Sequence, residues 1–115
     1  MDIKICDFGQ NAKKVVLIGK LNSVSAQTIE LPLAKLAASK TNIVVDMTGV
    51  DFIASVGIQQ LILAAKATLR ASHKLVLLDP SPLITDVLAI ARLEQYLPIV
   101  RSDEEARAAF AAGAT

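Results

Sequence analysis

Three aspartates stand where a sheet could bring them to one edge. Asp46 and Asp79 each end a short apolar run, and Asp51 lies in the loop that we expect after the first of these runs. Carboxylates at the ends of parallel strands can form a ligand site at the carboxyl edge of a sheet. They also commonly stabilise loops by accepting hydrogen bonds from nearby backbone groups. The loop-stabilising role is the favoured interpretation of Asp46, and a ligand site at this edge stays open.

Ser55 is the second candidate for chemistry, because it comes directly before a long amphipathic pattern. Its hydroxyl is expected to cap the helix by accepting a hydrogen bond from a backbone N–H. The same position suits regulated phosphorylation, since a helix N-terminus offers free N–H donors and the positive end of the dipole. A phosphate would add about −1.5 to −2 charges. Burying such a charge unpaired in an interface is costly, so a docked partner would leave. The two interpretations of Ser55 are compatible.

No catalytic constellation accompanies these residues. His73 is the only histidine and Cys6 the only cysteine, which excludes a zinc set and an intramolecular disulfide. A hydrolytic triad of Ser55, His73 and Asp46 fails because His73 falls at the far end of the helix that starts at Ser55, about 25 Å away. Glycine-rich phosphate-binding loops are missing as well. We therefore expect no catalytic residue, no metal and no cofactor, and a protein that is not an enzyme.

Short apolar runs predict the strands that carry these positions. The runs are rich in leucine and β-branched residues and do not alternate with polar residues, which is typical of strands covered on both faces. Residues 3–8 predict a further strand at the sheet edge. The runs are Val15–Ile18, Ile43–Val45, Leu75–Leu78 and Leu97–Val100.

Helical spacing fills the segments between the runs. In the first helix, Pro32 is expected to cause a kink or to mark the effective start. The third helix is expected to open with Ser81 as N-cap and Pro82 as its first residue. The last starts at Ser102, which has the capping-box spacing with Glu105. The predicted buried faces are Ala26, Ile29, Leu33 and Leu36 in the first helix; Ile58, Ile62, Ala65 and Leu69 in the second; Leu83, Val87 and Ile90 in the third; Ala106, Ala109 and Phe110 in the last.

Strands that alternate with helices need crossover connections, so the order along the chain predicts an α/β fold. We expect a mixed, mostly parallel sheet of four to five strands with about four helices packed on it. The length of 115 residues suits one domain over residues 1–115.

Composition excludes several classes of partner. The net charge is +1 and aromatic residues make up 3% of the chain, which argues against binding nucleic acid. The longest apolar stretches fall short of the roughly 18 residues that a membrane span needs, and the N-terminus does not resemble a signal peptide. A single cysteine suits a reducing compartment. We expect a cytoplasmic protein with no membrane partner, either a monomer or a weak dimer.

The segment DMTGVDFIASVGIQQLIL, residues 46–63, resembles the signature of the STAS domain found in anti-sigma factor antagonists and in sulfate transporter tails. The matching positions are Asp46, Gly49, Phe52, Ile53, Ser55, Gly57 and Ile58. The segments 19–22 (GKLN) and 74–82 (KLVLLDPSP) resemble other parts of the same domain, so the resemblance covers nearly the whole chain. Two positions depart from the family pattern. Ala54 stands where an acidic residue usually precedes the phosphoserine, and Asn22 stands where an aspartate is usual.

The resemblance implies an anti-sigma factor antagonist that works by partner switching. Unphosphorylated, it would sequester an anti-sigma factor serine kinase of the GHKL type and so free a sigma factor. The kinase would phosphorylate Ser55 and release would follow, and a PP2C-type phosphatase would reset the switch. Exposed Leu63 on the outer face of the second helix, with Gln59, Lys66 and Arg70, is a candidate partner contact. The expected partner-binding residues are Asn22, Asp51, Ala54, Ser55, Val56, Gly57, Gln59 and Leu63.

Two alternatives stay open. The chain could be a structural STAS subunit of a signalling assembly or of a lipid-transport ABC complex, with Ser55 as a plain cap. It could also be a small-ligand-binding domain that uses the strand ends near Asp46 and Asp79. Phosphate incorporation at Ser55 separates the switch from the structural subunit, and a measurable affinity for a small molecule favours the ligand-binding domain.

Overall fold

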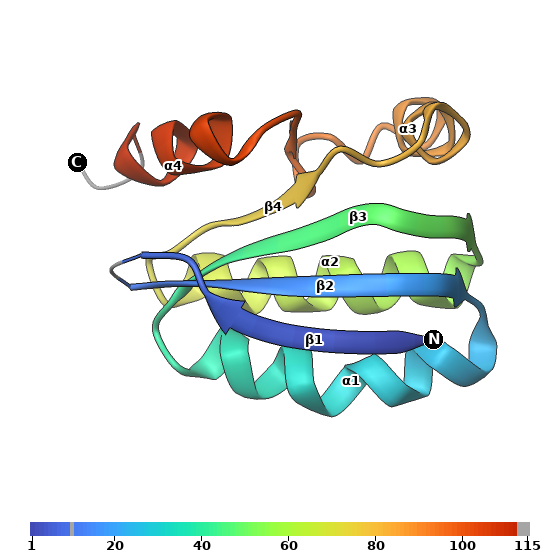
Figure 1. The fold of residues 1–115 in the computed structure, drawn as a ribbon, viewed down its shortest axis with the longest axis horizontal. Coiled ribbons are helices and arrows are strands. Elements are labelled where there is room, and N and C mark those ends of the chain that lie inside the picture. Colours follow the sequence, from blue (N-terminus) through green and yellow to red (C-terminus); the bar gives the residue numbers. More distant parts are fainter. Residues whose placement is uncertain (10, 113–115) are drawn as a thin grey trace.

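The structure, a computed structural model, describes residues 1–9 and 11–112. It contains one five-stranded sheet in the order β1-β2-β3-β4-β5. β1 is antiparallel to β2, and the remaining neighbours are parallel (Figure 1). The predicted α/β architecture is therefore confirmed. The elements are β1 (Asp2–Asp7), β2 (Ala12–Leu21), α1 (Ser23–Ala38), β3 (Asn42–Ile53), α2 (Ser55–Arg70), β4 (Leu75–Leu78), α3 (Pro82–Ile90), β5 (Ile99–Val100) and α4 (Asp103–Ala112).

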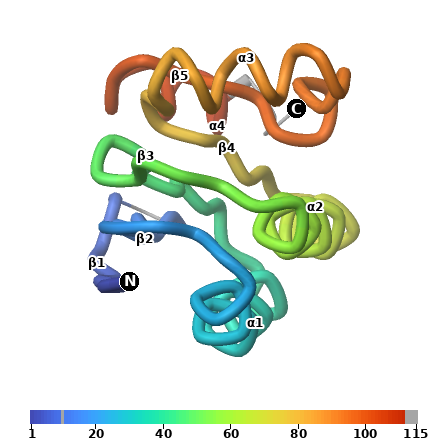
Figure 2. The backbone as a smooth tube through the Cα atoms, turned by 90° about the vertical axis from the view of Figure 1, so that its right-hand side faces the viewer, coloured from blue at the N-terminus to red at the C-terminus, as the bar shows by residue number. Residues whose placement is uncertain are grey.

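The sheet is covered on both faces where its central strands lie. On one face, buried residues of the strands form a core with α1, α2 and α3. On the other face, α4 docks through Ala106 and Phe110 in a smaller cluster (Figure 2). This double cover explains why the central runs are continuously apolar. Lys14 of β2 and Asp103 at the start of α4 form a half-buried ion pair of 3.1 Å that joins the two elements.

β3 is much longer than its apolar run predicts. The segment after Asp46 was expected to be a loop, and this expectation is wrong because the strand continues to Ile53. β2 is also long and pairs with β3 along this extension. β3 accommodates two extra residues there, because Leu17 alone faces the Met47–Thr48 step and Asp51 has no partner in β2. Such bulges disrupt the ladder locally, bend the strand and increase its twist, and here the pairing resumes after each of them.

The buried faces of two helices differ from the prediction. α2 buries Gly57, Leu61, Ala64, Ala65 and Thr68, whereas Leu69 is 67% exposed. α3 buries Ile84 and Leu88, whereas Leu83 and Ile90 face solvent. Nearly every position of α3 is apolar or small, so spacing alone fits two stripes. The cap at Ser81 and the way α3 packs against the sheet determine that the stripe with Ile84 and Leu88 is the buried one.

The helix ends mostly follow the predicted signals. Ser81 accepts a hydrogen bond from the N–H of Ile84, with Pro82 as the first helical residue. Ser102 accepts one from the N–H of Glu105 (3.1 Å), and the Glu105 carboxylate takes the N–H of Arg101 (3.2 Å). In α1, Pro32 lies inside the helix and does not mark its start. Over residues 1–9 and 11–112, no helix is both long enough and apolar enough to cross a bilayer.

Candidate functional site

Two strand-to-helix junctions meet at the carboxyl edge of the sheet and form the candidate site. β2 ends at Leu21 and leads into α1, and β3 ends at Ile53 and leads into α2. The N–H of Ala54 donates a 2.8 Å hydrogen bond to the carbonyl of Leu21, which ties the junctions together. Asn22 and Ser55 each follow one end of this bond, so the structure brings these two predicted site residues to the same edge.

Ser55 is the first residue of α2 and is exposed. The expectation that it caps the helix is wrong, because Ala54 occupies the N-cap position in an extended conformation and makes no side-chain cap bond. The Ala54 carbonyl accepts the N–H groups of Gly57 (2.9 Å) and Ile58 (3.1 Å). The N–H groups of Ser55 and Val56 come before these bonds and have no intrahelical acceptor. The Ser55 hydroxyl, for which no hydrogen bond is found among the described residues, therefore stands beside donors that can receive an anion.

Gly57 sets how closely α2 approaches the end of β2. A Cβ on Gly57 would lie 2.6 Å from Cγ of Leu21 and 3.2 Å from its carbonyl oxygen. Both residues are buried. A side chain here would push the first turn of α2 away from the sheet, so Gly57 contributes to the site by packing and fixes where Ser55 is presented.

Asn22 caps α1. Its side-chain oxygen accepts the N–H groups of Val24 and Ser25, both at 3.1 Å. Ser25 completes a capping box, since its hydroxyl accepts the N–H of Asn22 at 2.8 Å and donates to the carbonyl of Lys20 at 2.6 Å. An aspartate at position 22 could accept the same two bonds. Asn22 therefore supports its junction at the same sheet edge as Ser55.

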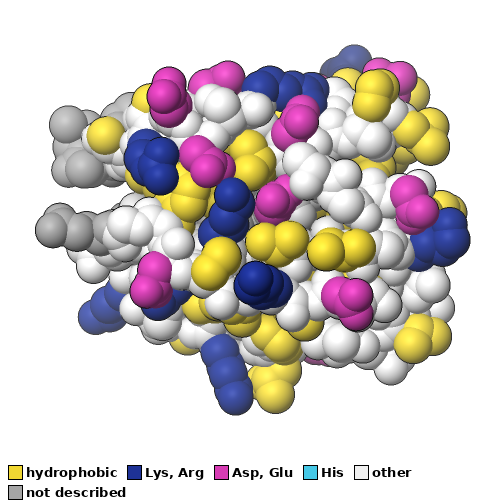
Figure 3. All heavy atoms as spheres, viewed as in Figure 1, with side chains coloured by type: hydrophobic (Ala, Val, Ile, Leu, Met, Phe, Trp, Pro, Cys, Tyr) yellow, Lys and Arg dark blue, Asp and Glu magenta, His cyan; other side chains and the backbone are white. Residues whose placement is uncertain are grey.

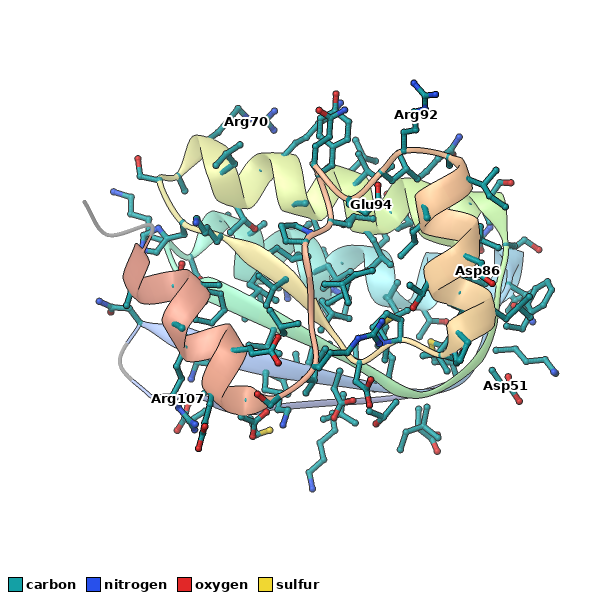
Figure 4. All side chains as sticks on the ribbon, turned by 90° about the horizontal axis from the view of Figure 1, so that it is seen from above. Asp51, Arg70, Asp86, Arg92, Glu94 and Arg107 are labelled. Atoms are coloured by element: carbon teal, nitrogen blue, oxygen red, sulfur yellow. The ribbon has the colours of Figure 1, made fainter. Side chains whose placement is uncertain are left out.

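The surface around Ser55 combines exposed apolar groups with a single ion pair. Asp51 lies on the bulge of β3, 3.7 Å from the Lys20 ammonium, and both side chains are well exposed. The same ammonium lies over the ring of Phe52, 6.0 Å from its centroid. Figure 4 shows Asp51 at the end of the molecule where α3 also lies, opposite the end that carries Arg70. The ion pair keeps this surface close to neutral.

The remaining predicted residues extend the surface along α2. Ala54 and Val56 are half-buried, and Gln59 is exposed one turn further on. Leu63 is 60% exposed, about 12 Å along the helix axis from Ser55. The exposure predicted for Leu63 is confirmed. We define the switch surface as Asn22, Val24, Asp51, Phe52, Ala54, Ser55, Val56, Gln59 and Leu63.

Sequence reasoning missed two members of the switch surface. Val24 in the first turn of α1 is 73% exposed, and Phe52 near the end of β3 is 44% exposed. Val24 could have been found from its place off the apolar stripe of its helix. Phe52 could not, because its outward direction depends on the bulge at Asp51.

The other residues that could do chemistry, Asp46, Asp79 and His73, make hydrogen bonds or ion pairs with nearby residues. The Asp46 carboxylate accepts hydrogen bonds from the N–H (3.0 Å) and hydroxyl (2.7 Å) of Thr48, which fits a role in stabilising the bulge. Asp79 pairs with Arg101 at 3.0 Å. His73 lies beyond the far end of α2, with Nδ1 2.8 Å from the carbonyl oxygen of Ala71. Within the described part of the chain, no group of three potential ligands could hold a metal ion.

Known proteins resemble this chain in sequence and in fold. A Bordetella bronchiseptica protein, BtrV, carries a provisional name as an anti-sigma factor antagonist; it is 32% identical over 95 residues, 82% of each chain. An anti-sigma factor antagonist (STAS) domain protein from Planctomyces limnophilus superposes with a TM-score of 0.80 at 18% identity, covering 96% of this chain and 99% of that one.

The anti-sigma factor antagonist SpoIIAA has been solved in two forms that share this fold. The unphosphorylated form gives a TM-score of 0.73 at 17% identity and covers 97% of this chain and 99% of its own. The phosphorylated form, from Bacillus, gives 0.74 at 14% identity and covers 94% and 99%. At such identities these two structures show a common fold.

The STAS domain family matches residues 8–106, which include β2 to β5, α1 to α3 and the first turn of α4. This match spans the sheet edge, both junctions and the whole of α2, and it agrees with the relative that is 32% identical. The chain belongs to the STAS domain family.

Proposed function

We propose that this chain is an anti-sigma factor antagonist that switches partners through phosphorylation of Ser55. In its unphosphorylated state it binds an anti-sigma factor serine kinase of the GHKL type through the switch surface. The kinase then transfers the γ-phosphoryl group of ATP to the Ser55 hydroxyl and releases ADP. The phosphorylated protein dissociates, and a PP2C-type phosphatase removes the phosphate by hydrolysis. The chain itself supplies no catalytic group.

The observation that carries this proposal is the state of Ser55. Its hydroxyl is exposed at the first position of α2, and the cap of that helix does not use it. Phosphorylation would therefore remove no hydrogen bond found among residues 1–9 and 11–112, and the neighbouring amides and the helix dipole favour the added charge. The name of BtrV and the existence of SpoIIAA in both phosphorylation states support the same interpretation.

The switch acts through desolvation. Val24, Phe52 and Leu63 offer apolar area that a partner could cover, and Ser55 belongs to the same surface. A phosphate at Ser55 would have to lose its water when the partner docks, and an unpaired buried charge strongly opposes binding. Ala54 and Asn22 carry no charge, so at these two positions no carboxylate repels the phosphate on Ser55.

Intact-mass spectrometry after incubation with ATP and a candidate kinase tests the proposal. The wild-type protein is expected to gain one phosphate, and Ser55→Ala is expected to gain none. Ser23→Ala is the matched control, because Ser23 is also an exposed serine at the first position of a helix on the same sheet edge. Its phosphorylation should match the wild type, and phosphatase should reverse the mass gain.

Complex formation completes the test. Unphosphorylated protein and kinase should co-elute in size-exclusion chromatography, and the phosphorylated protein should elute alone. A stable complex that never carries phosphate would favour the structural subunit instead. Phosphate on Ser23 in place of Ser55 would contradict the proposed site.

A further inference from the structure

β1 is an open edge of the sheet. It pairs with β2 on one side only, and Figure 2 shows it at the rim of the molecule. Ile5 is 45% exposed there. An open edge presents unpaired backbone groups that can pair with another strand. We propose that β1 pairs antiparallel with β1 of a second copy, in a single register, to form a weak two-fold dimer. This inference does not depend on the proposed function.

The hydrogen bonds of the β1–β2 hairpin identify the backbone groups that face the open edge. In an antiparallel pair, residues opposite each other alternate between bonded and non-bonded pairs. Phe8 donates its N–H to the carbonyl of Ala12 at 3.0 Å. Alternation from this pair directs the backbone groups of Asp2, Lys4 and Cys6 towards β2. The N–H and carbonyl groups of Ile3, Ile5 and Asp7 therefore point outwards.

Only a few two-fold registers set these outward residues opposite one another. Centred on Ile3, Asp2 faces Lys4 of the second copy twice, and Ile5 faces Met1 twice. Centred on Lys4, two ammonium groups oppose each other. A centre at Ile5 or Cys6 sets an isoleucine against Asp7. The register centred on Ile3 is the one in which charges of opposite sign and apolar side chains both match.

The two faces of β1 separate these pairs cleanly. Met1 and Ile3 pack against the core on the helix-covered face. Asp2 and Lys4 lie on the opposite face, where acidic and basic side chains stand side by side over β1 and β2 (Figure 3). A dimer in the proposed register would therefore continue an apolar face and a charged face across the new strand pair.

The charges required for pairing are available. Asp2 and Lys4 are exposed, and neither makes an ion pair with any described residue. Asp7 differs, because Lys13 of the same chain pairs with it and lowers the pKa of its carboxyl. The overlap is only about five residues, so the contact is small and the dimer is weak.

Sedimentation equilibrium of the whole chain tests the proposal. The wild type is expected to dimerise reversibly at concentrations up to about 1 mM, and high salt should weaken the dimer. Asp2→Lys and Lys4→Asp should each raise the dissociation constant about tenfold or more, because like charges then face each other across the pair. The double variant Asp2→Lys/Lys4→Asp should restore wild-type association. Asp7→Asn lies outside the overlap and should not change it.

The circular dichroism spectrum confirms that each variant is folded. A wild type that stays monomeric at about 1 mM would overturn the proposal, and so would single variants that dimerise like the wild type. Folded double variants that fail to recover would overturn the register. Loss of the dimer in Asp7→Asn would place the contact elsewhere on the strand and overturn it as well.

Discussion

Among single residues, Gly57 has the tightest steric requirement in the site. Replacing it with alanine would favour the helix locally, but the new Cβ would meet Leu21 at 2.6 Å. We expect Gly57→Ala to lower the free energy of unfolding by about 1–3 kcal/mol, the range typical of overpacking. Urea denaturation measures this loss.

A second substitution checks the cause of that effect. Leu21→Ala removes Cγ and both Cδ atoms, which crowd position 57, so the double variant should lose less stability than the two single losses added together. Gln59→Ala, at an exposed position of the same helix, should stay within about 0.5 kcal/mol of the wild type. A Gly57→Ala protein as stable as the wild type would contradict the close approach.

Substitutions of Asn22 can distinguish the effect of its capping hydrogen bonds on stability from the effect of a negative charge at the same position. Asn22→Ala removes the acceptor for two N–H groups and should cost about 1 kcal/mol of stability. Asn22→Asp keeps the acceptor and adds a negative charge at the positive end of α1, so its stability should equal or exceed that of the wild type. Urea denaturation of both variants measures this. If Asn22→Ala is as stable as the wild type, the capping box does not stabilise the junction between β2 and α1.

At the scale of the elements, α3 offers a direct test of helix orientation. Leu88 is fully buried and Ile90 is 83% exposed, although sequence spacing placed Ile90 inside. Leu88→Ala should destabilise the protein by about 2–5 kcal/mol, because it leaves a cavity in the core. Ile90→Lys should change stability by no more than about 0.5 kcal/mol. Thermal unfolding ranks the two, and the reverse ranking would mean that α3 presents its other face to the sheet.

The elements show what the sequence could predict and why. The runs of the three central strands β2, β3 and β4 were recognised because strands covered on both faces need continuous apolar residues. The extension of β3 beyond Asp46 was not predicted, because Thr48, Gly49 and Asp51 are residue types typical of a loop. Backbone pairing with the long β2 holds them in the strand, and that pairing is a tertiary contact. The buried face of α3 was missed for a different reason, since an almost wholly apolar helix gives periodicity little to distinguish.

For the whole molecule, the fold carries the site on a rigid edge. One backbone hydrogen bond, between Ala54 and Leu21, joins the two strand-to-helix junctions. They pack on a core in which Leu21 and Leu61 are fully buried. The sequence predicted Ser55 and Leu63 as surface positions on one helix. The residues of α1 that share this surface, such as Val24, lie near Ser55 because β2 pairs with β3 in parallel. Local sequence pattern does not predict which strands pair. We therefore expect the proposed switch to act through a change of charge on a fixed surface.

A fixed surface predicts local effects of a negative charge at Ser55. In Ser55→Glu, amide chemical shifts should change in residues 20–24 and 51–60, next to the new charge, and stay close to wild type in β1 and α4. The physical reason is that the Ser55 hydroxyl makes no hydrogen bond among the described residues, while the free N–H groups at the start of α2 can donate to the carboxylate. Two-dimensional amide NMR measures this directly, with Ser55→Ala as the neutral control. Shifts spread through β4 and α4 would mean that the charge rearranges the core, and the switch would then be conformational.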